Sequence, residues 1–225
     1  NDIVHPDGIT GVIYKAGEQV ATLTTDKNGQ ASVDGLYLGD YYVKEISPSV
    51  GYLADETEHD LVCNYEGDLV AEVKRDCTSL EQVMKQPFQI IKAANNGKTD
   101  ADLLKGAGFT AYLESSLTKK ADGSYDFDSA TPVVIGENGA TEMFTDEKGY
   151  ACSIALPYGT YIVRETTTPH NYTPVDDFTV RITENNPNQP QTWRELLDDE
   201  FEAKLKIIKQ DDETKKPVLQ KNTEF

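Results

Sequence analysis

Residues 39–45 read Gly-Asp-Tyr-Tyr-Val-Lys-Glu, and residues 159–165 read Gly-Thr-Tyr-Ile-Val-Arg-Glu. The two stretches are offset by 120 residues (165 − 45 = 120), and after each one come a Pro and then a Tyr seven residues beyond the Glu. The turn Asp-Lys-Asn-Gly at 26–29 recurs as Asp-Glu-Lys-Gly at 146–149 with the same offset. Self-similarity at a fixed offset indicates tandem copies of one folding unit. In each copy a carboxylate ends an apolar run, and such a carboxylate costs stability unless it has a partner.

The composition favours a folded, acidic protein. Hydrophobic residues make up 38% of the 225 residues, which is enough to build a core. The formal net charge of −18, from 39 acidic and 21 basic residues, opposes binding to nucleic acid or to an anionic membrane. No apolar run approaches the roughly 20 residues of a membrane span, so we expect no membrane contact within this sequence. The chain opens in mid-pattern without a signal peptide, so we expect a segment of a longer protein.

The sequence predicts no cofactor and no metal site. Cys63, Cys77 and Cys152 form no C-x-x-C pair, and no histidine stands at metal-ligand spacing. A Cys63–Cys77 disulfide remains an open alternative, because pairing does not follow from sequence alone. No phosphate-binding loop and no nucleophile elbow is present, so we expect no enzyme with turnover.

Short alternating runs separated by turn residues indicate β-strands. In the first copy these runs are residues 12–14, 20–23, 41–43, 61–63 and 69–73. Residues 88–92 and 205–209 each end in Ile-Ile-Lys and open a further copy, with second strands at 106–112 and 220–225. Helical patterns cover 79–85 and 192–202, and for the latter a strand ending at Leu196-Leu197-Asp198 is an equal alternative. We expect an all-β protein of tandem antiparallel β-sandwich modules.

The repeats divide the chain into three parts. Residues 1–87 form a module that lacks its first strands, residues 88–203 form a complete module, and residues 204–225 form the first two strands of a third module. The expected partners are neighbouring modules of the same protein. Because open sheet edges recruit strands, strand complementation between fragments is a further alternative, with Lys209 meeting Glu45 and Asp76.

These motifs resemble a known family. The Ile-Ile-Lys strand, the Gly-x-Tyr-x-Val-x-Glu strand with its downstream Pro and Tyr, and an acidic closing strand are similar to the Cna B-type or SpaA-like domains. These are prealbumin-like, immunoglobulin-like sandwiches in the pilins and adhesins of Gram-positive bacteria. The resemblance covers nearly the whole chain.

The resemblance implies an intramolecular isopeptide bond in the complete module. Lys92 matches the nucleophile on the first strand, and Glu165 matches the assisting, catalytic carboxylate. The partner on the closing strand is Asp198, by an ungapped count, with Asp199 as the alternative. In the first module the corresponding residues are Glu45 and Asp76 without a lysine, and the third part offers Lys209 alone. The alternatives without a bond are that Lys92 extends to water at the end of its strand, and that Glu165 is an exposed cross-strand partner of a basic residue.

General chemistry supports such a bond wherever these groups are buried. A protonated amine is no nucleophile, and burial disfavours charge on an amine and on carboxyls. A neutral Lys92 can attack a protonated Asp198 while Glu165 moves protons, and the fold supplies a high effective concentration. The reaction occurs once and releases water. The amide would tie two strands about 100 residues apart, worth about 4.7 kcal/mol in the chain-entropy model for cross-links.

The function that the resemblance implies is structural. We expect a stalk segment of an adhesin or pilin-like protein, extracellular on the cell wall of a Gram-positive bacterium. The alternative is a binding module for a host matrix protein or glycan. An exposed aromatic or apolar patch on the insertion at residues 113–132 would favour this alternative.

Overall fold

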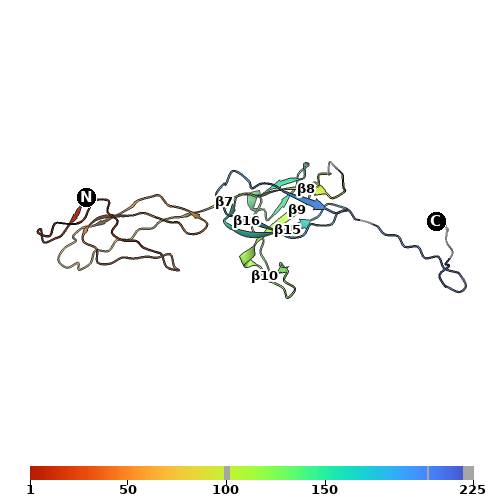
Figure 1. Cartoon of the computed structure of the whole chain (residues 1–225), viewed down its shortest axis with the longest axis horizontal. Helices are drawn as coiled ribbons and strands as arrows, with labels where there is room; N and C mark the ends of the chain where they lie inside the picture. The colour runs from red at the N-terminus through yellow and green to blue at the C-terminus, as the bar shows by residue number, and fades with distance from the viewer. Residues whose placement is uncertain (99–101, 202, 220–225) are drawn as a thin grey trace. The chain divides into compact units, whose positions relative to one another are not determined.

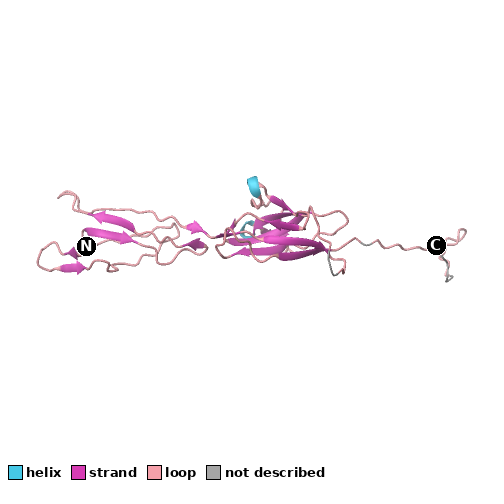
Figure 2. Ribbon diagram, turned by 90° about the horizontal axis from the view of Figure 1, so that it is seen from above, coloured by secondary structure: helices cyan, strands magenta, loops and turns pink. Residues whose placement is uncertain are grey.

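The structure is a computed structural model that describes residues 1–98, 102–201 and 203–219. The chain divides into two compact units, Asn1–Met84 and Lys85–Phe225 (Figure 1). Nearly all of the regular structure is β-strand (Figure 2), which confirms the all-β expectation. In the described part, helical structure is limited to the 3-10 turns η1 (Glu114–Ser116) and η2 (Glu137–Gly139). None of the helices there is long and apolar enough to cross a membrane.

Unit one consists of three antiparallel strand pairs, β1–β2, β3–β5 and β4–β6. The strand that ends two residues before Glu45 is β3, and it pairs with β5. The strands are β1 (Ile3–Val4), β2 (Val12–Tyr14), β3 (Gly39–Val43), β4 (Tyr52–Leu53), β5 (His59–Cys63) and β6 (Gln82–Val83).

Unit two is built on two sheets. One contains four antiparallel strands in the order β12-β9-β15-β16, and the other contains three in the order β13-β8-β17. Two short pairs, β7–β14 and β10–β11, complete the unit. The strands are β7 (Lys85–Gln86), β8 (Gln89–Ala94), β9 (Gly108–Leu113), β10 (Thr118–Lys119), β11 (Tyr125–Asp126), β12 (Glu142–Phe144), β13 (Tyr150–Cys152), β14 (Leu156–Pro157), β15 (Gly159–Thr167), β16 (Phe178–Ile182) and β17 (Arg194–Asp198).

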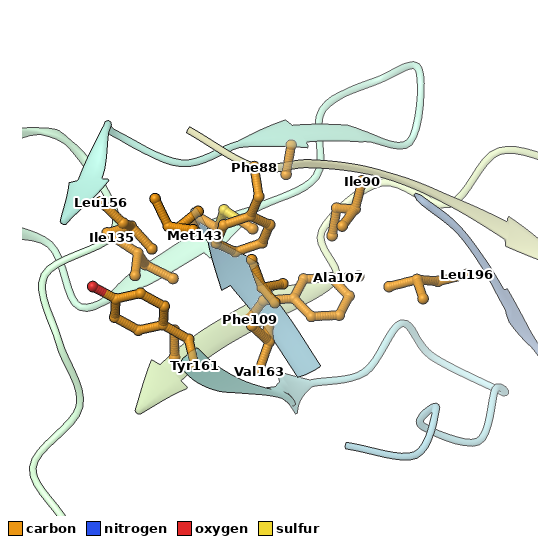
Figure 3. Packing of buried hydrophobic residues seen from close by; sticks show 14 residues of the cluster. Phe88, Ile90, Ala107, Phe109, Ile135, Met143, Leu156, Tyr161, Val163 and Leu196 are labelled. Carbon is orange, nitrogen blue, oxygen red and sulfur yellow. The ribbon is translucent and has the colours of Figure 1, made fainter. Parts of the chain in front are cut away.

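The core of unit two lies between these sheets. Ile90 and Leu196 from the three-stranded sheet share one buried cluster with Phe109 and Val163 from the four-stranded sheet (Figure 3). Because side chains alternate along a strand, each of these strands turns every second residue inward. A polar side chain at one of these inward positions is therefore placed between the sheets.

One strand pair departs from the expected antiparallel pattern. β17 lies beside β8 and runs parallel to it, with Leu196 opposite Lys92 and Asp198 opposite Ala94. The first long strand and the last strand of unit two are therefore neighbours that point the same way. A parallel pair needs a long crossover connection, and here the rest of the unit provides it.

The helix expected at residues 79–85 is wrong. Leu80, Glu81 and Met84 are good helix formers, but β6 pairs with β4 and β7 pairs with β14, so tertiary pairing overrides local propensity. Residues 192–202 likewise contain the strand β17, which was the alternative for that segment.

Three expected strands do not form in the described structure. Residues 20–23, 69–73 and 205–209 are assigned to no strand, and most of them are exposed. A β-strand needs a hydrogen-bonded neighbour and a covered face, and alternation in the sequence does not guarantee either one. The strand expected at residues 220–225 lies outside the described residues.

Candidate isopeptide site

Lys92 is a fully buried lysine in the middle of β8. Its backbone is held on both sides, because its N–H donates to the Gly149 carbonyl (2.7 Å) and its own carbonyl accepts from the Leu104 N–H (2.9 Å). Gly149 has φ +63°, and a Cβ there would collide with the Lys92 carbonyl oxygen. At position 149 only glycine fits without a shift of the backbone. The turn at 146–149 therefore positions the strand that carries Lys92.

Two carboxyls meet the Lys92 amine inside the sandwich. Lys92 Nζ donates to Glu165 Oε2 at 2.7 Å and also to Asp198 Oδ1. All three side chains have no exposed surface. Asp198 comes from β17 on the same sheet as Lys92, and Glu165 comes from β15 on the opposite sheet. The centroid of the Phe109 ring lies 5.7 Å from Lys92 Nζ.

The register of the strands explains this meeting. Leu196 is opposite Lys92, and Asp198 lies two residues further along β17, so both face inward with Lys92. Leu197, between them, is exposed. On the other sheet Glu165 is paired with Phe109, whose ring is also buried. Three polar groups thus occupy inward positions that a sandwich normally fills with apolar side chains.

Burial changes the acidity of Asp198. Desolvation raises its pKa to about 6, although the hydrogen bond from Lys92 and the charge of Lys92 act to lower it. Glu165 and Asp199 raise it further through their negative charges. A carboxyl with a pKa of about 6 is half protonated at pH 6 and about one-tenth protonated at pH 7. Glu165 Oε1 and Asp198 Oδ2 are buried and have no hydrogen-bond partner among the described residues, so each is available to carry or receive a proton.

The backbone fixes the orientation of Glu165. The Val175 N–H, ten residues later, donates to Glu165 Oε2 at 3.0 Å. The oxygen that accepts from Lys92 therefore accepts from a backbone donor as well. This leaves Oε1 as the oxygen that has no described partner.

The remaining predicted residues lie outside this group. Asp199 is exposed, and its Oδ1 accepts from Asn95 Nδ2 at 2.7 Å. Lys209 is exposed in the segment after β17, where its carbonyl accepts from the Val218 N–H. Asp76 is exposed and belongs to no strand. Among the residues that the structure describes, no cluster of His, Cys, Asp or Glu could hold a metal ion.

Glu45 in unit one accepts the same backbone hydrogen bond as Glu165 in unit two, although Glu45 is only half-buried. Its Oε2 accepts from the N–H of Asp55, ten residues later, at 2.5 Å. Its carboxyl is hydrogen-bonded to Glu81, a residue that the sequence analysis did not select for this site. The structure thus brings Glu45 together with Glu81 and not with Asp76.

Strand pairing explains why Glu81 was missed. Tyr52 is opposite Val83 in unit one, and Tyr172 is opposite Glu200 in unit two. The two Tyr residues are 120 positions apart, but their partners on the closing segment, Val83 and Glu200, are only 117 apart (200 − 83 = 117). With an offset of 117, Asp198 of unit two corresponds to position 81 of unit one. Unit one and unit two differ in length by three residues before this segment. An ungapped count cannot detect such a difference.

Comparisons with known proteins place the chain in a family. A model of the SpaA prealbumin-like fold domain matches residues 7–76 and 87–195. The Bacillus anthracis TIE protein has 26% identity and a TM-score of 0.50, over 79% of this chain and 28% of that one. The minor pilin GBS52 of Streptococcus agalactiae has 16% identity and a TM-score of 0.44, over 83% and 71% of the two chains. A search of curated protein sequences found no match.

The chain thus spans little more than a quarter of the Bacillus anthracis protein. The two matched stretches of the family model fall in consecutive units, one in unit one and one in unit two, and together they cover well over half of the sequence. The chain therefore belongs to the SpaA family of prealbumin-like fold domains.

Proposed function

We propose that this chain is a load-bearing segment of a Gram-positive pilin or surface adhesin, and that unit two locks itself by an isopeptide bond between Lys92 and Asp198. The observation that carries the proposal is the buried contact of one amine with two carboxyls on three strands. An unreacted buried ion pair adds little net stability, because desolvation offsets the attraction. Formation of a covalent bond would explain why these three polar side chains are buried together.

The chemistry balances as a condensation. Transfer of one proton from the Lys92 ammonium to Glu165 leaves a neutral amine, which attacks Cγ of protonated Asp198. The Nζ–Cγ bond forms, the bond from Cγ to the hydroxyl oxygen breaks, and Glu165 gives its proton to the leaving hydroxyl, which departs as water. The newly bonded nitrogen then gives its second proton to Glu165. The products are an amide between Lys92 and Asp198, one water and a protonated Glu165 carboxyl. Each molecule reacts once, so the chain is a substrate of its own chemistry and not an enzyme with turnover.

The strand order suits a tensile role. Tension enters unit two at the start of β8 and leaves it at the end of β17, and these neighbouring strands run parallel. Pulling their opposite ends loads the hydrogen bonds between them in shear. An amide between Lys92 and Asp198 would carry that load covalently. Because an amide is not reduced by thiols, the lock would need none of the three cysteines, which are all free.

The same argument suggests where the chain acts and what it contacts. A force-bearing module belongs in a string of similar modules outside the cell, so the proposed partners are its neighbours in the same protein. The proposed location is the cell wall surface of a Gram-positive bacterium.

The insertion at residues 113–132 does not favour the binding-module alternative. Its rings pack on the unit, with Tyr112 and Phe127 centroids 5.0 Å apart and the Arg164 guanidinium 4.4 Å from the Phe127 centroid. None of the large hydrophobic side chains that are exposed in the described residues lies in this insertion. It presents no apolar patch for a matrix protein or glycan.

Single-molecule extension tests the proposed role. Lys92 and Asp198 are 106 positions apart. If the bond forms, this segment cannot extend when the chain is pulled. The extension lost is about 350 Å, at roughly 3.3 Å per residue. The unaltered chain is expected to lack this length gain, and the Lys92→Met variant is expected to show it. A full length gain from unit two of the unaltered chain would contradict the proposal.

A further inference from the structure

A second set of contacts joins the two ends of the site. The loop that follows Glu165 lies against the segment that follows Asp198. The Phe201 N–H donates to the Asn171 carbonyl (3.1 Å), the Thr173 N–H donates to the Asp199 carbonyl (2.9 Å), and Tyr172 forms a β-bridge with Glu200. We call this set of contacts the exit clamp, because it holds the segment by which the chain leaves unit two.

The loop of the exit clamp also holds Glu165. Two residues after Thr173, the Val175 N–H donates to Glu165 Oε2. The path from the exit segment to the assisting carboxylate therefore runs through five consecutive loop residues, 171–175. If the loop shifts, the Val175 N–H that donates to Glu165 shifts with it.

Asn171 sets the shape of this loop. Its φ is +73°, in the left-handed region that side chains other than Gly, Asn and Asp rarely adopt. This conformation turns the Asn171 carbonyl toward the Phe201 N–H. Asn171 therefore contributes to the site through its backbone conformation rather than through its side chain.

Unit one repeats the exit clamp with a different sequence. Gly51, at the position of Asn171 (171 − 51 = 120), has φ +88°. Its carbonyl accepts from the Met84 N–H at 2.8 Å, and Tyr52 pairs with Val83. The Asp55 N–H donates to Glu45 there as the Val175 N–H does to Glu165. The loops read Ser-Pro-Ser-Val-Gly-Tyr and Thr-Pro-His-Asn-Tyr, so the two units share the geometry more closely than the residues.

We propose that Asn171 is a positioning residue for the condensation of Lys92 with Asp198, which acts through the exit clamp and the Val175 donor to hold Glu165 in its reactive orientation. This inference rests on the proposed function. The bond that forms is Lys92 Nζ to Asp198 Cγ, with loss of water, and Asn171 touches neither atom. Its effect is on the rate at which the bond forms.

The test follows bond formation in time. Each chain is recovered unfolded, refolded, sampled into denaturant and weighed by intact-mass spectrometry. Asn171→Val is expected to slow locking by about tenfold or more, since displacing a reacting group by 1 Å can cost ~10²-fold. Asn171→Gly, which keeps φ > 0 and copies Gly51, is expected to lock at the rate of the unaltered chain.

Two further variants separate positioning from loss of fold. Asn138 also has positive φ (+56°), but it is exposed on the turn η2, away from the strands that carry the three reacting residues. Asn138→Val imposes a similar backbone strain and is expected to lock normally. Phe201→Pro removes the N–H on the other side of the exit clamp and is expected to slow locking, as Asn171→Val does. Thermal unfolding of each variant in the Lys92→Met background measures the stability cost alone.

The outcomes distinguish the two proposals. If the unaltered chain never loses water, the proposed function fails and this inference fails with it. If the unaltered chain locks, and Asn171→Val locks as fast as Asn138→Val, only the positioning role is overturned. Slow locking in Asn171→Val and Phe201→Pro, with rescue by Asn171→Gly, supports it.

Discussion

Lys92 and Asp198 lie on neighbouring parallel strands, two register positions apart, and their side chains meet between the sheets of unit two. They are 106 positions apart, and the segment between them includes most of unit two. A bond between these residues would close nearly the whole module into one loop.

Replacement of the amine should remove the lock and lower stability. Lys92→Met keeps an unbranched side chain, one atom shorter than lysine, and removes the nucleophile. The lost cross-link is worth about 4.7 kcal/mol for a loop of about 100 residues. This corresponds to a fall of roughly 20–30 °C in the midpoint of unit two. Differential scanning calorimetry measures it, and the transition of unit one serves as the internal control. Equal midpoints for unit two with and without the lysine would contradict this prediction.

Replacement of Asp198 by Asn should leave the final product unchanged. Attack of Lys92 on an amide carbonyl expels ammonia where the acid expels water, and both routes give the same Lys–Asp amide. The locked Asp198→Asn chain should therefore have the mass of the locked unaltered chain. Asp198→Ala is the control and should keep the full mass of its sequence. A locked mass in the alanine variant would point to another partner, with Asp199 the first candidate.

Removal of the proton carrier should slow the reaction strongly while a side chain of the same size still contacts Lys92. In Glu165→Gln the side chain keeps its size and its acceptor for the Val175 N–H, but it cannot take a proton from Lys92. We expect locking to slow by roughly 10²–10⁴-fold, the usual contribution of a general acid–base group. The measurement is the locked fraction after refolding. Normal locking of the glutamine variant would show that Glu165 is not the proton carrier.

The rate of locking should depend on pH through Asp198. Burial raises the pKa of Asp198 to about 6, so its carboxyl holds a proton below that pH and loses it above. Only the protonated form has a hydroxyl that can leave as water. The initial rate should therefore fall about tenfold for each pH unit above about 6. Refolding at pH 5, 6, 7 and 8 with timed mass analysis tests this. A rate that rises steadily from pH 6 to pH 8 would be the opposite result.

The turn behind Lys92 should tolerate only glycine. Gly149→Ala would place a Cβ against the Lys92 carbonyl and add strain at φ +63°. The matched variant is Gly29→Ala in unit one, at the same position of the repeat, where φ is +73° and nothing lies within 4 Å of the new Cβ. Gly29→Ala should cost about 1 kcal/mol from strain alone, and Gly149→Ala clearly more, roughly 2–4 kcal/mol. Urea unfolding in the Lys92→Met background measures both. Equal costs would show that Lys92 is not held by this turn.

The sequence predicted the fold where a motif was repeated. The runs that contain Lys92 and Glu165 are strands because alternation and turn residues agree there, and Asp198 lies on the closing strand. The helix expected at 79–85 failed because helix formers such as Leu80 and Met84 are overridden by pairing with strands that are distant in the sequence. The parallel pairing of β8 with β17 was not predictable, because no local pattern encodes the direction of a neighbour.

The site of unit one shows the limit of counting along a repeat. Glu45 could be named because it closes a repeated strand. Its neighbour Glu81 could not, because unit one is three residues longer than unit two between this Tyr and the closing segment, and only the strand pairs Tyr52–Val83 and Tyr172–Glu200 reveal this. Asp76 was therefore selected in its place. Which residues of two strands become neighbours depends on the lengths and paths of the loops between them, and these paths cannot be read from the sequence alone.

The mass of the denatured protein tests the central claim most directly. A chain that has joined Lys92 to Asp198 has lost one water, about 18 Da, relative to its sequence. We predict this loss in the purified, fully denatured protein, together with a branched peptide linking Lys92 to Asp198 after proteolysis, and its absence in Lys92→Met. A denatured chain with the full mass of its sequence would contradict the self-locking account.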